Sequence, residues 1–79
     1  MHDYEVWWVD EWDDQIDEPR MEAAKLTGAP RLECAEALLP HLARVQRHER
    51  GYGELVILDE GGNRVAQRYP VAALCPAVA

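Results

Sequence analysis

The sequence predicts a small α+β domain in which an antiparallel sheet packs on one long amphipathic helix. Residues 32–50 have the apolar spacing of such a helix, and three shorter segments, 4–9, 54–59 and 64–69, are rich in β-branched and aromatic residues. The chain has 79 residues, which is the length of one domain. We therefore expect a single domain, residues 1–79, with the element order β-α-α-β-β.

The first expected element is a strand at Tyr4–Val9. Its side chains alternate between two faces, and the face that carries Val6 and Trp8 is wholly apolar, so it should meet the core. Trp7 and Val9 make the second face partly apolar as well. This indicates that another part of the chain covers that face.

Between this strand and the long helix, the sequence predicts a loop and then a short helix. Asp10–Glu18 has no clear period and its acids repel one another, so we expect a loop with one irregular turn. Pro19 suits the first turn of a helix, predicted at Arg20–Leu26, with Asp17 or Glu18 as its cap and a glycine, Gly28, as its stop.

The long helix is predicted at Leu32–Arg50. Acids near its start, arginines near its end and Gly51 directly after it match the helix dipole and the preferred C-terminal cap. Pro40 falls on the side expected to face solvent, where a bend curves the helix around the core. The side chains expected to face the core are Ala35, Leu38, Leu39, Leu42 and Val45.

The last part of the chain predicts a β-hairpin. Glu54–Asp59 and Arg64–Tyr69 are β-rich runs on either side of a Gly-Gly-Asn turn. The first run is apolar on both faces, so it should be a central strand. Pro70 ends the second run, and Val71–Leu74 should tuck against the core.

The negative charge is concentrated at the start of the chain. The first 22 residues carry nine carboxylates and one arginine, a formal charge of −8, whereas residues 23–79 carry +1. The six acids of 10–18 would be spaced about 2 Å apart along a helix and about 5 Å apart in an extended chain, a range that brackets the phosphate spacing of a DNA strand. Such a segment repels nucleic acid and attracts proteins that bind it. The candidate partner-binding residues are Asp10, Glu11, Trp12, Asp13, Asp14, Asp17 and Glu18.

Two interpretations of this segment remain open. Tryptophan is a preferred interface anchor, especially among polar groups, so Trp12 could contact a partner. Alternatively, Trp12 folds back onto the domain and the acids form a solvated loop.

Catalytic and metal sites are not expected. A deep ligand cleft is hard to build in so short a chain, and the sequence contains no serine, no HExxH motif and no P-loop. His41 and His48 lie about 10 Å apart along a helix, which is too far to share one ion. A calcium loop starting at Asp13 fails because its sixth and twelfth positions hold Glu18 and Ala24. We expect no enzyme activity, no cofactor and no metal.

The cysteine content and the chain start indicate a cytoplasmic setting. Cys34 and Cys75 are expected to be free thiols, although a single disulfide between them stays open. The start of the chain lacks the pattern of a secretory signal, and no apolar run is long enough to span a bilayer.

The chain as a whole resembles the small acidic anti-CRISPR proteins encoded by phages and mobile elements of GC-rich bacteria. The resemblance rests on WWVDEWDDQIDE at the start and GELVILDEGGNRVAQRYPV near the end, around one long helix. This group has no signature motif, so no functional residue is carried over. The resemblance implies a protein of the bacterial host cytoplasm that binds a type I CRISPR surveillance complex, commonly on the Lys/Arg surface for target DNA.

We therefore expect a non-enzymatic inhibitor of a basic, Lys/Arg-rich nucleic-acid-binding protein, acting as a DNA mimic through Asp10–Glu18. It would contact neither nucleic acid nor membrane. The alternative is a protein-interaction module of the antitoxin or adaptor type that uses an exposed Trp face, with Trp7 and Trp12, and a solubilising acidic loop. A further alternative to the expected monomer is a dimer formed through Val71–Ala79.

Overall fold

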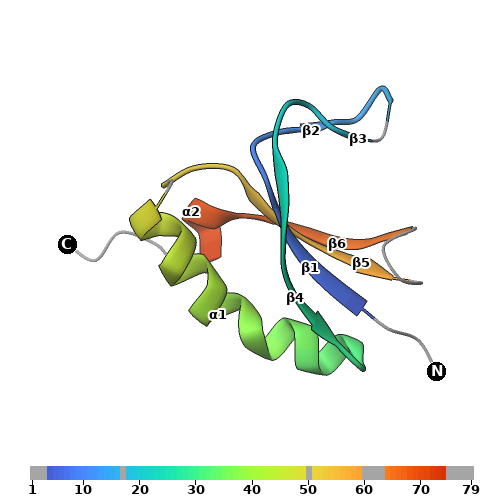
Figure 1. Cartoon of the computed structure of the whole chain (residues 1–79), viewed down its shortest axis with the longest axis vertical. Helices are drawn as coiled ribbons and strands as arrows, with labels where there is room; N and C mark the ends of the chain where they lie inside the picture. Colours follow the sequence, from blue (N-terminus) through green and yellow to red (C-terminus); the bar gives the residue numbers. More distant parts are fainter. Residues whose placement is uncertain (1–3, 17, 50, 60–63, 75–79) are drawn as a thin grey trace.

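Four strands within the described residues form one antiparallel sheet, and the long helix packs on one of its faces (Figure 1). The structure, a computed structural model, describes residues 4–16, 18–49, 51–59 and 64–74. The strand order is β4-β1-β5-β6, and β2 and β3 form a separate two-stranded ribbon. The predicted α+β class is confirmed. The elements are β1 (Tyr4–Val9), β2 (Trp12–Asp13), β3 (Glu18–Pro19), β4 (Ala23–Ala29), α1 (Leu32–Glu49), β5 (Glu54–Asp59), β6 (Arg64–Pro70) and α2 (Val71–Leu74).

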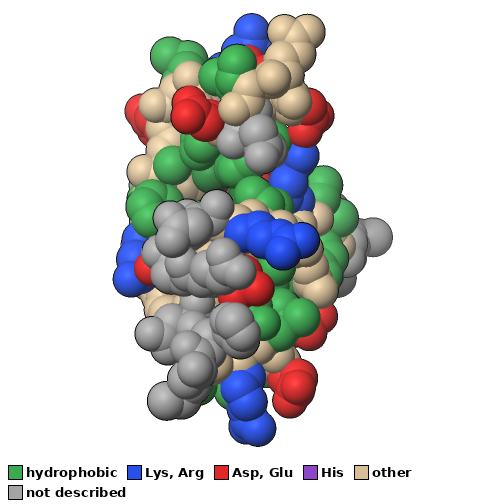
Figure 2. All heavy atoms as spheres, turned by 90° about the vertical axis from the view of Figure 1, so that its right-hand side faces the viewer, with side chains coloured by type: hydrophobic (Ala, Val, Ile, Leu, Met, Phe, Trp, Pro, Cys, Tyr) green, Lys and Arg blue, Asp and Glu red, His purple; other side chains and the backbone are tan. Residues whose placement is uncertain are grey.

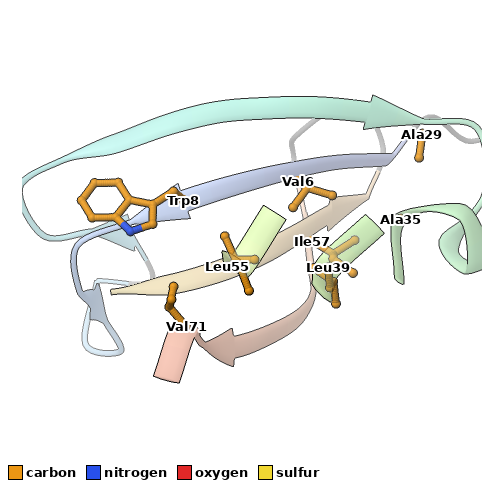
Figure 3. Packing of buried hydrophobic residues seen from close by; sticks show 9 residues of the cluster. Val6, Trp8, Ala29, Ala35, Leu39, Leu55, Ile57 and Val71 are labelled. Carbon is orange, nitrogen blue, oxygen red and sulfur yellow. The ribbon is translucent and has the colours of Figure 1, made fainter. Parts of the chain in front are cut away.

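The core lies between the sheet and α1. β1 pairs with β4 on one side and with β5 on the other, so it is a central strand. Val6 and Trp8 are both buried, which confirms the predicted core face of β1. They pack with Leu55 and Ile57 of β5 and with the α1 side chains that face the sheet (Figure 3). Val71 at the start of α2 closes one end of this core, as predicted for Val71–Leu74.

Trp8 is held by the segment that connects α1 to β5. Its indole N–H donates a hydrogen bond of 2.9 Å to the Tyr52 carbonyl oxygen, and the Tyr52 ring meets it edge-on at 5.5 Å. The next residue, Gly53, has a φ of 92° and its carbonyl oxygen accepts a 3.0 Å hydrogen bond from the Val71 N–H. The same short connection therefore fixes both the largest core side chain and the start of α2.

The predicted helix at Arg20–Leu26 is wrong, because this part of the chain enters β4. Pairing with β1, with Trp7 opposite Lys25 in the register, gives alternate residues of β4 backbone hydrogen bonds along an edge of β1 that would otherwise stay open. A helix of one or two turns has no comparable gain, since its nucleation is unfavourable. Gly28, predicted as the helix stop, lies inside the strand instead.

The predicted loop at Asp10–Glu18 is also wrong in part. β2 and β3 pair with Trp12 opposite Pro19, so the segment folds back on itself as a short hairpin. Two further backbone hydrogen bonds close its base, from the Asp10 N–H to the Glu22 oxygen at 3.0 Å and from the Arg20 N–H to the Glu11 oxygen at 2.7 Å. Asp17 lies outside the described residues. The order of elements is thus β-β-β-β-α-β-β-α.

The long helix is confirmed, but its buried face is rotated from the one predicted. Ala35 and Leu39 are buried as expected, whereas Leu38 and Val45 are 36% and 38% exposed. Buried residues that the periodicity did not select are Ala43 and Gln46. Small alanine side chains at 35 and 43 let the helix backbone approach the sheet closely, which turns the larger side chains toward its flanks.

The boundaries of the helix follow its sequence signals. Pro40 is exposed, as predicted. Gly51, at a φ of 74°, donates its N–H to the Gln46 oxygen at 3.0 Å and so completes a C-terminal cap. Arg50, the predicted last residue of the helix, lies outside the described residues.

The predicted hairpin of β5 and β6 is confirmed, and β5 is central in the sheet. The middle of β5 is fully buried on both faces, at Leu55, Val56 and Ile57. The turn at 60–63 lies outside the described residues, as does Cys75; Cys34 is a half-buried free thiol on α1.

We predict that Gly53→Ala destabilises the protein far more than Gly51→Ala. Both glycines have a positive φ, but a Cβ at Gly53 would collide with the Val9 carbonyl oxygen and lie 2.7 Å from Trp8 Nε1, whereas a Cβ at Gly51 meets nothing closer than 3.6 Å. We expect losses of about 3 kcal/mol for Gly53→Ala and about 1 kcal/mol for Gly51→Ala. Urea unfolding measures both, and equal losses would contradict this account of the connection.

Candidate protein-interaction surface

The sheet face opposite α1 is apolar across three strands. The register places Trp7 of β1 opposite Val56 of β5, and Leu58 of β5 opposite Val65 of β6. Val9 and Val56 are almost completely buried although α1 lies on the other side of the sheet. The prediction that the second face of β1 is covered is therefore confirmed.

The cover is the hairpin formed by β2, β3 and the turn between them, residues 10–20, which we call the acidic arm. The arm projects away from the sheet and stands across from the ends of β5 and β6 that lie near their connecting turn (Figure 1). Trp12 and Pro19 of the arm are half-buried and line the space between the arm and the sheet. An acid-rich segment thus forms part of the covering of an apolar surface.

Between the arm and the sheet lies a hollow of about 580 Å³. This volume is within the range of about 300–1,000 Å³ typical of ligand pockets. Figure 2 looks onto this side of the molecule and shows hydrophobic side chains below the arm, with acidic and basic side chains around them. The lining residues are Trp7, Val9, Trp12, Glu18, Pro19, Ala23, Val56, Leu58, Arg64 and Val65.

Arg68 of β6 ties the arm to the sheet. Its guanidinium forms a bidentate ion pair with the Glu54 carboxylate of β5, at 3.0 and 3.2 Å, and a 2.6 Å ion pair with the Asp14 carboxylate of the arm. It also lies 5.4 Å from the centre of the Trp12 ring, which is a cation–π distance. Hydrogen bonding to the Glu54 carboxylate raises the pKa of Arg68 above its ordinary value, against the lowering effect of burial, so the residue stays charged.

Asp10 holds the base of the arm. Its Oδ1 accepts hydrogen bonds from the backbone N–H groups of Glu11 at 2.7 Å and Met21 at 3.2 Å, which join the two ends of the hairpin. Partial burial acts to raise the pKa of Asp10, but backbone N–H groups, with that of Glu22 the strongest, outweigh it and lower the pKa below its ordinary value. The ionised carboxylate is therefore part of the arm's structure.

Other predicted site residues also have partners within the arm. Glu11 pairs with Arg20 at 3.2 Å, although both side chains are 62% exposed, and Asp13 accepts the Gln15 N–H at 3.0 Å. Glu18 is exposed and has no side-chain partner among the described residues. Of the seven predicted residues, the structure brings six into one arm, and Asp17 lies outside the described residues.

The position of Trp12 agrees in part with each of the two interpretations, because its ring packs on the domain and also keeps some exposed surface. It is half-buried beneath Arg68, on the sheet face that is opposite α1, and it does not join the core beside the helix. Its remaining surface lines the hollow. Trp7 lies across from it with its indole N–H bonded to the Glu5 carboxylate at 2.8 Å, which fixes the ring over the same face.

The sequence did not single out the sheet residues of this surface. Val56, Leu58 and Val65 line the hollow, and Arg68 anchors its cover. The apolar residues on both faces of 54–59 could have indicated Val56 and Leu58. A strand of this kind needs a cover on each face, and only one long helix was expected. No pattern in the sequence pairs Arg68 with Asp14, which lie 54 residues apart.

An apolar hollow flanked by charged groups can bind an apolar side chain of another molecule and orient it by ion pairs. Within the described residues, no three His, Cys, Asp or Glu side chains lie together as metal ligands would. No helix in that part of the chain is long and apolar enough to cross a bilayer.

We predict that Arg68→Ala loosens the arm without unfolding the domain. The change removes the ion pairs with Asp14 and Glu54 and the contact with Trp12, for a loss of about 1–2 kcal/mol. Amide hydrogen exchange should become faster at residues 10–20 and stay unchanged in α1. Arg44→Ala, which removes an exposed arginine on α1, serves as the matched control. Unchanged exchange in the arm would show that Arg68 does not hold it.

We predict that the contribution of Asp10 to stability disappears in acid. Because the folded pKa of Asp10 lies below its ordinary value of about 3.9, its stabilising effect is complete above that value and is lost as the pH falls through the folded pKa. Asp10→Asn should therefore destabilise the protein at neutral pH, and the difference from wild type should shrink below about pH 4. Urea unfolding between neutral and acidic pH measures this, with Glu33→Gln on α1 as the control. A difference that grows in acid would reverse the assignment.

Comparisons with family models, with curated proteins and with solved structures found no match for this chain. The candidate surface has its own geometry: a hollow with a mixed apolar and charged lining, two tryptophans within that lining, and an acidic arm tied to the sheet by Arg68.

Proposed function

We propose that this protein acts by binding a basic surface of a nucleic-acid-handling protein, with the acidic arm and the hollow as the contact surface. The observation that carries the proposal is the position of the acidic arm directly beside a preformed hollow with both apolar and charged residues in its lining. Protein interfaces combine an apolar, often aromatic, centre with a polar rim. Here Trp7 and Trp12 supply the aromatic groups, and the arm supplies one side of the rim.

The exposed acids of the arm support a basic partner. Residues 10–20 carry six carboxylates and one arginine, and the Asp14 and Glu11 side chains remain 78% and 62% exposed despite their ion pairs. Asp13 lies directly opposite Glu18 in the ribbon, an arrangement of like charges that costs free energy until a cation approaches. Such a cluster raises the rate at which a basic partner associates.

The hollow supports a contact that is more than electrostatic. Surface ion pairs add little affinity at physiological salt, so a tight complex also needs apolar surface that loses water. Half-buried Leu58 and Val65, with Trp7 and Trp12, provide that surface next to the arm. The partner class implied by the resemblance, a type I CRISPR surveillance complex, has a basic surface of this kind and is our first candidate; occupying that surface would inhibit DNA binding.

A second candidate function is a general interaction module in which the hollow dominates and the acids serve solubility. The two tryptophans at the walls of the hollow favour it. The two functions differ in salt dependence, because binding through charges weakens steeply with salt and binding through the hollow does not. Weak salt dependence together with a large loss on Trp12→Ala would favour the second.

We predict that Glu18→Lys combined with Glu22→Lys weakens binding to a purified type I surveillance complex about tenfold at low salt, chiefly by slowing association. Both acids are exposed. The matched control is Glu33→Lys combined with Glu36→Lys, which makes the same charge change on the exposed side of α1 and should change binding less than about twofold. Surface plasmon resonance measures the rates.

A competition experiment with target DNA tests the mimicry directly. If the protein mimics DNA, it and the target duplex should compete for the complex. Simultaneous binding of both would show that mimicry is wrong, and equal binding by the two charge-reversed variants would show that the arm is not the contact.

A further inference from the structure

Two charged residues of opposite sign, neither with an ion pair among the described residues, belong to the lining of the hollow on different elements. Glu18 belongs to β3 in the acidic arm, and Arg64 is the first residue of β6. Both side chains are exposed, and neither has a hydrogen bond or ion pair with a described residue. The apolar floor between them is formed by Val56, Leu58 and Val65.

These two charges differ from the others on the same sheet face. Lys25 of β4 pairs with Glu5 of β1 at 3.5 Å, and Arg68 pairs with Glu54 at 3.0 Å. Within each of these pairs the two charges neutralise each other. The first pair joins β4 to β1, and Arg68 also joins β6 to the arm. Glu18 and Arg64 have no such ion pair within the described residues, although Asp59 lies opposite Arg64 in the register, so both charges can interact with groups from another molecule.

The size of the hollow defines what can fit. The part of its lining that lies on β1, β5 and β6 runs from Trp7 through Leu58 to Val65, which is two strand spacings or about 10 Å. In an extended peptide, side chains at i, i+2 and i+4 share one face and span about 13 Å. One such segment can therefore place a central apolar side chain on the floor and a charged side chain at each wall.

We propose that the hollow is a docking site for a short extended segment of the partner protein. The segment carries a Lys or Arg that pairs with Glu18, an apolar side chain that enters the hollow, and an Asp or Glu that pairs with Arg64. This inference rests on the proposed function, since it names which part of the partner meets the hollow. Charge complementarity selects this occupant, because an apolar molecule without charges would leave both walls unused.

The test uses three blocked peptides in NMR titrations of the full-length ¹⁵N-labelled protein. Their sequences are Lys-Thr-Leu-Thr-Glu, Lys-Thr-Leu-Thr-Lys and Glu-Thr-Leu-Thr-Glu. We expect the first to bind about threefold or more tightly than the other two, with shifts at the Trp7 and Trp12 indoles and at Val56. No binding below about 10 mM, or shifts confined to α1, would overturn the proposal.

Two variants test whether Glu18 and Arg64 themselves select the peptide. Arg64→Glu leaves an acidic side chain at both positions, so the preference should move to the peptide with two lysines. Glu18→Lys leaves a basic side chain at both positions, so the preference should move to the peptide with two glutamates. Arg44→Glu on α1 makes the same charge change as Arg64→Glu and should leave the preference unchanged.

The outcome is separable from that of the proposed function. If the peptide preference ignores both wall variants while Glu18→Lys with Glu22→Lys still weakens binding to the surveillance complex, this inference is wrong and the proposed function stands. If the peptide preference moves as expected while binding to that complex is unaffected, the docking site stands and the basic partner is wrong.

Discussion

The strand β1 carries large apolar side chains on both faces, and the arrangement of the rest of the chain depends on this property. Val6 and Trp8 require a cover on one side, and Trp7 and Val9 require one on the other. Helix α1 supplies the first cover. On the other face the acidic arm stands over part of the sheet, joined to it by the Arg68 contacts with Asp14 and Trp12 and separated from it elsewhere by the hollow. A segment rich in carboxylates is thereby placed over apolar surface, where its charges must be held by specific partners.

The partners of these carboxylates change the meaning of the acidic segment. Asp10 closes the base of the arm, and Asp14 joins it to Arg68. Much of the charge that looked available for a partner thus also stabilises the protein itself. Binding and stability share residues in the arm, so a change at Asp14 alters both, whereas Glu18 and Arg64 report on binding without a structural partner among the described residues. The arm is short, and its ion pair to the sheet, between Asp14 and Arg68, is largely exposed on the Asp14 side, so we expect the arm to open more easily than the core strands.

Sequence patterns predicted the elements whose side chains repeat with a clear period. The strand at Tyr4–Val9, the helix from Leu32 and the final hairpin were all recognised, because local period, turn residues and capping agree there. The segment that forms β4 was mistaken for a helix, since its alanines and leucine favour helix locally and only the open edge of β1 makes it a strand. The rotated face of α1 has a similar origin, because alanine is counted as weakly apolar although its small size decides how close a helix can pack.

The sequence by itself determined the α+β class, the central place of β5, the position of the long helix and the concentration of acid before residue 23. These are local properties of composition and spacing. Only the tertiary structure decided that the acids fold into an arm, that Arg68 holds it, and that Trp12 faces a hollow lined by Val56 and Leu58. Such contacts join residues far apart in the chain, and their geometry depends on the register of a sheet that must form first.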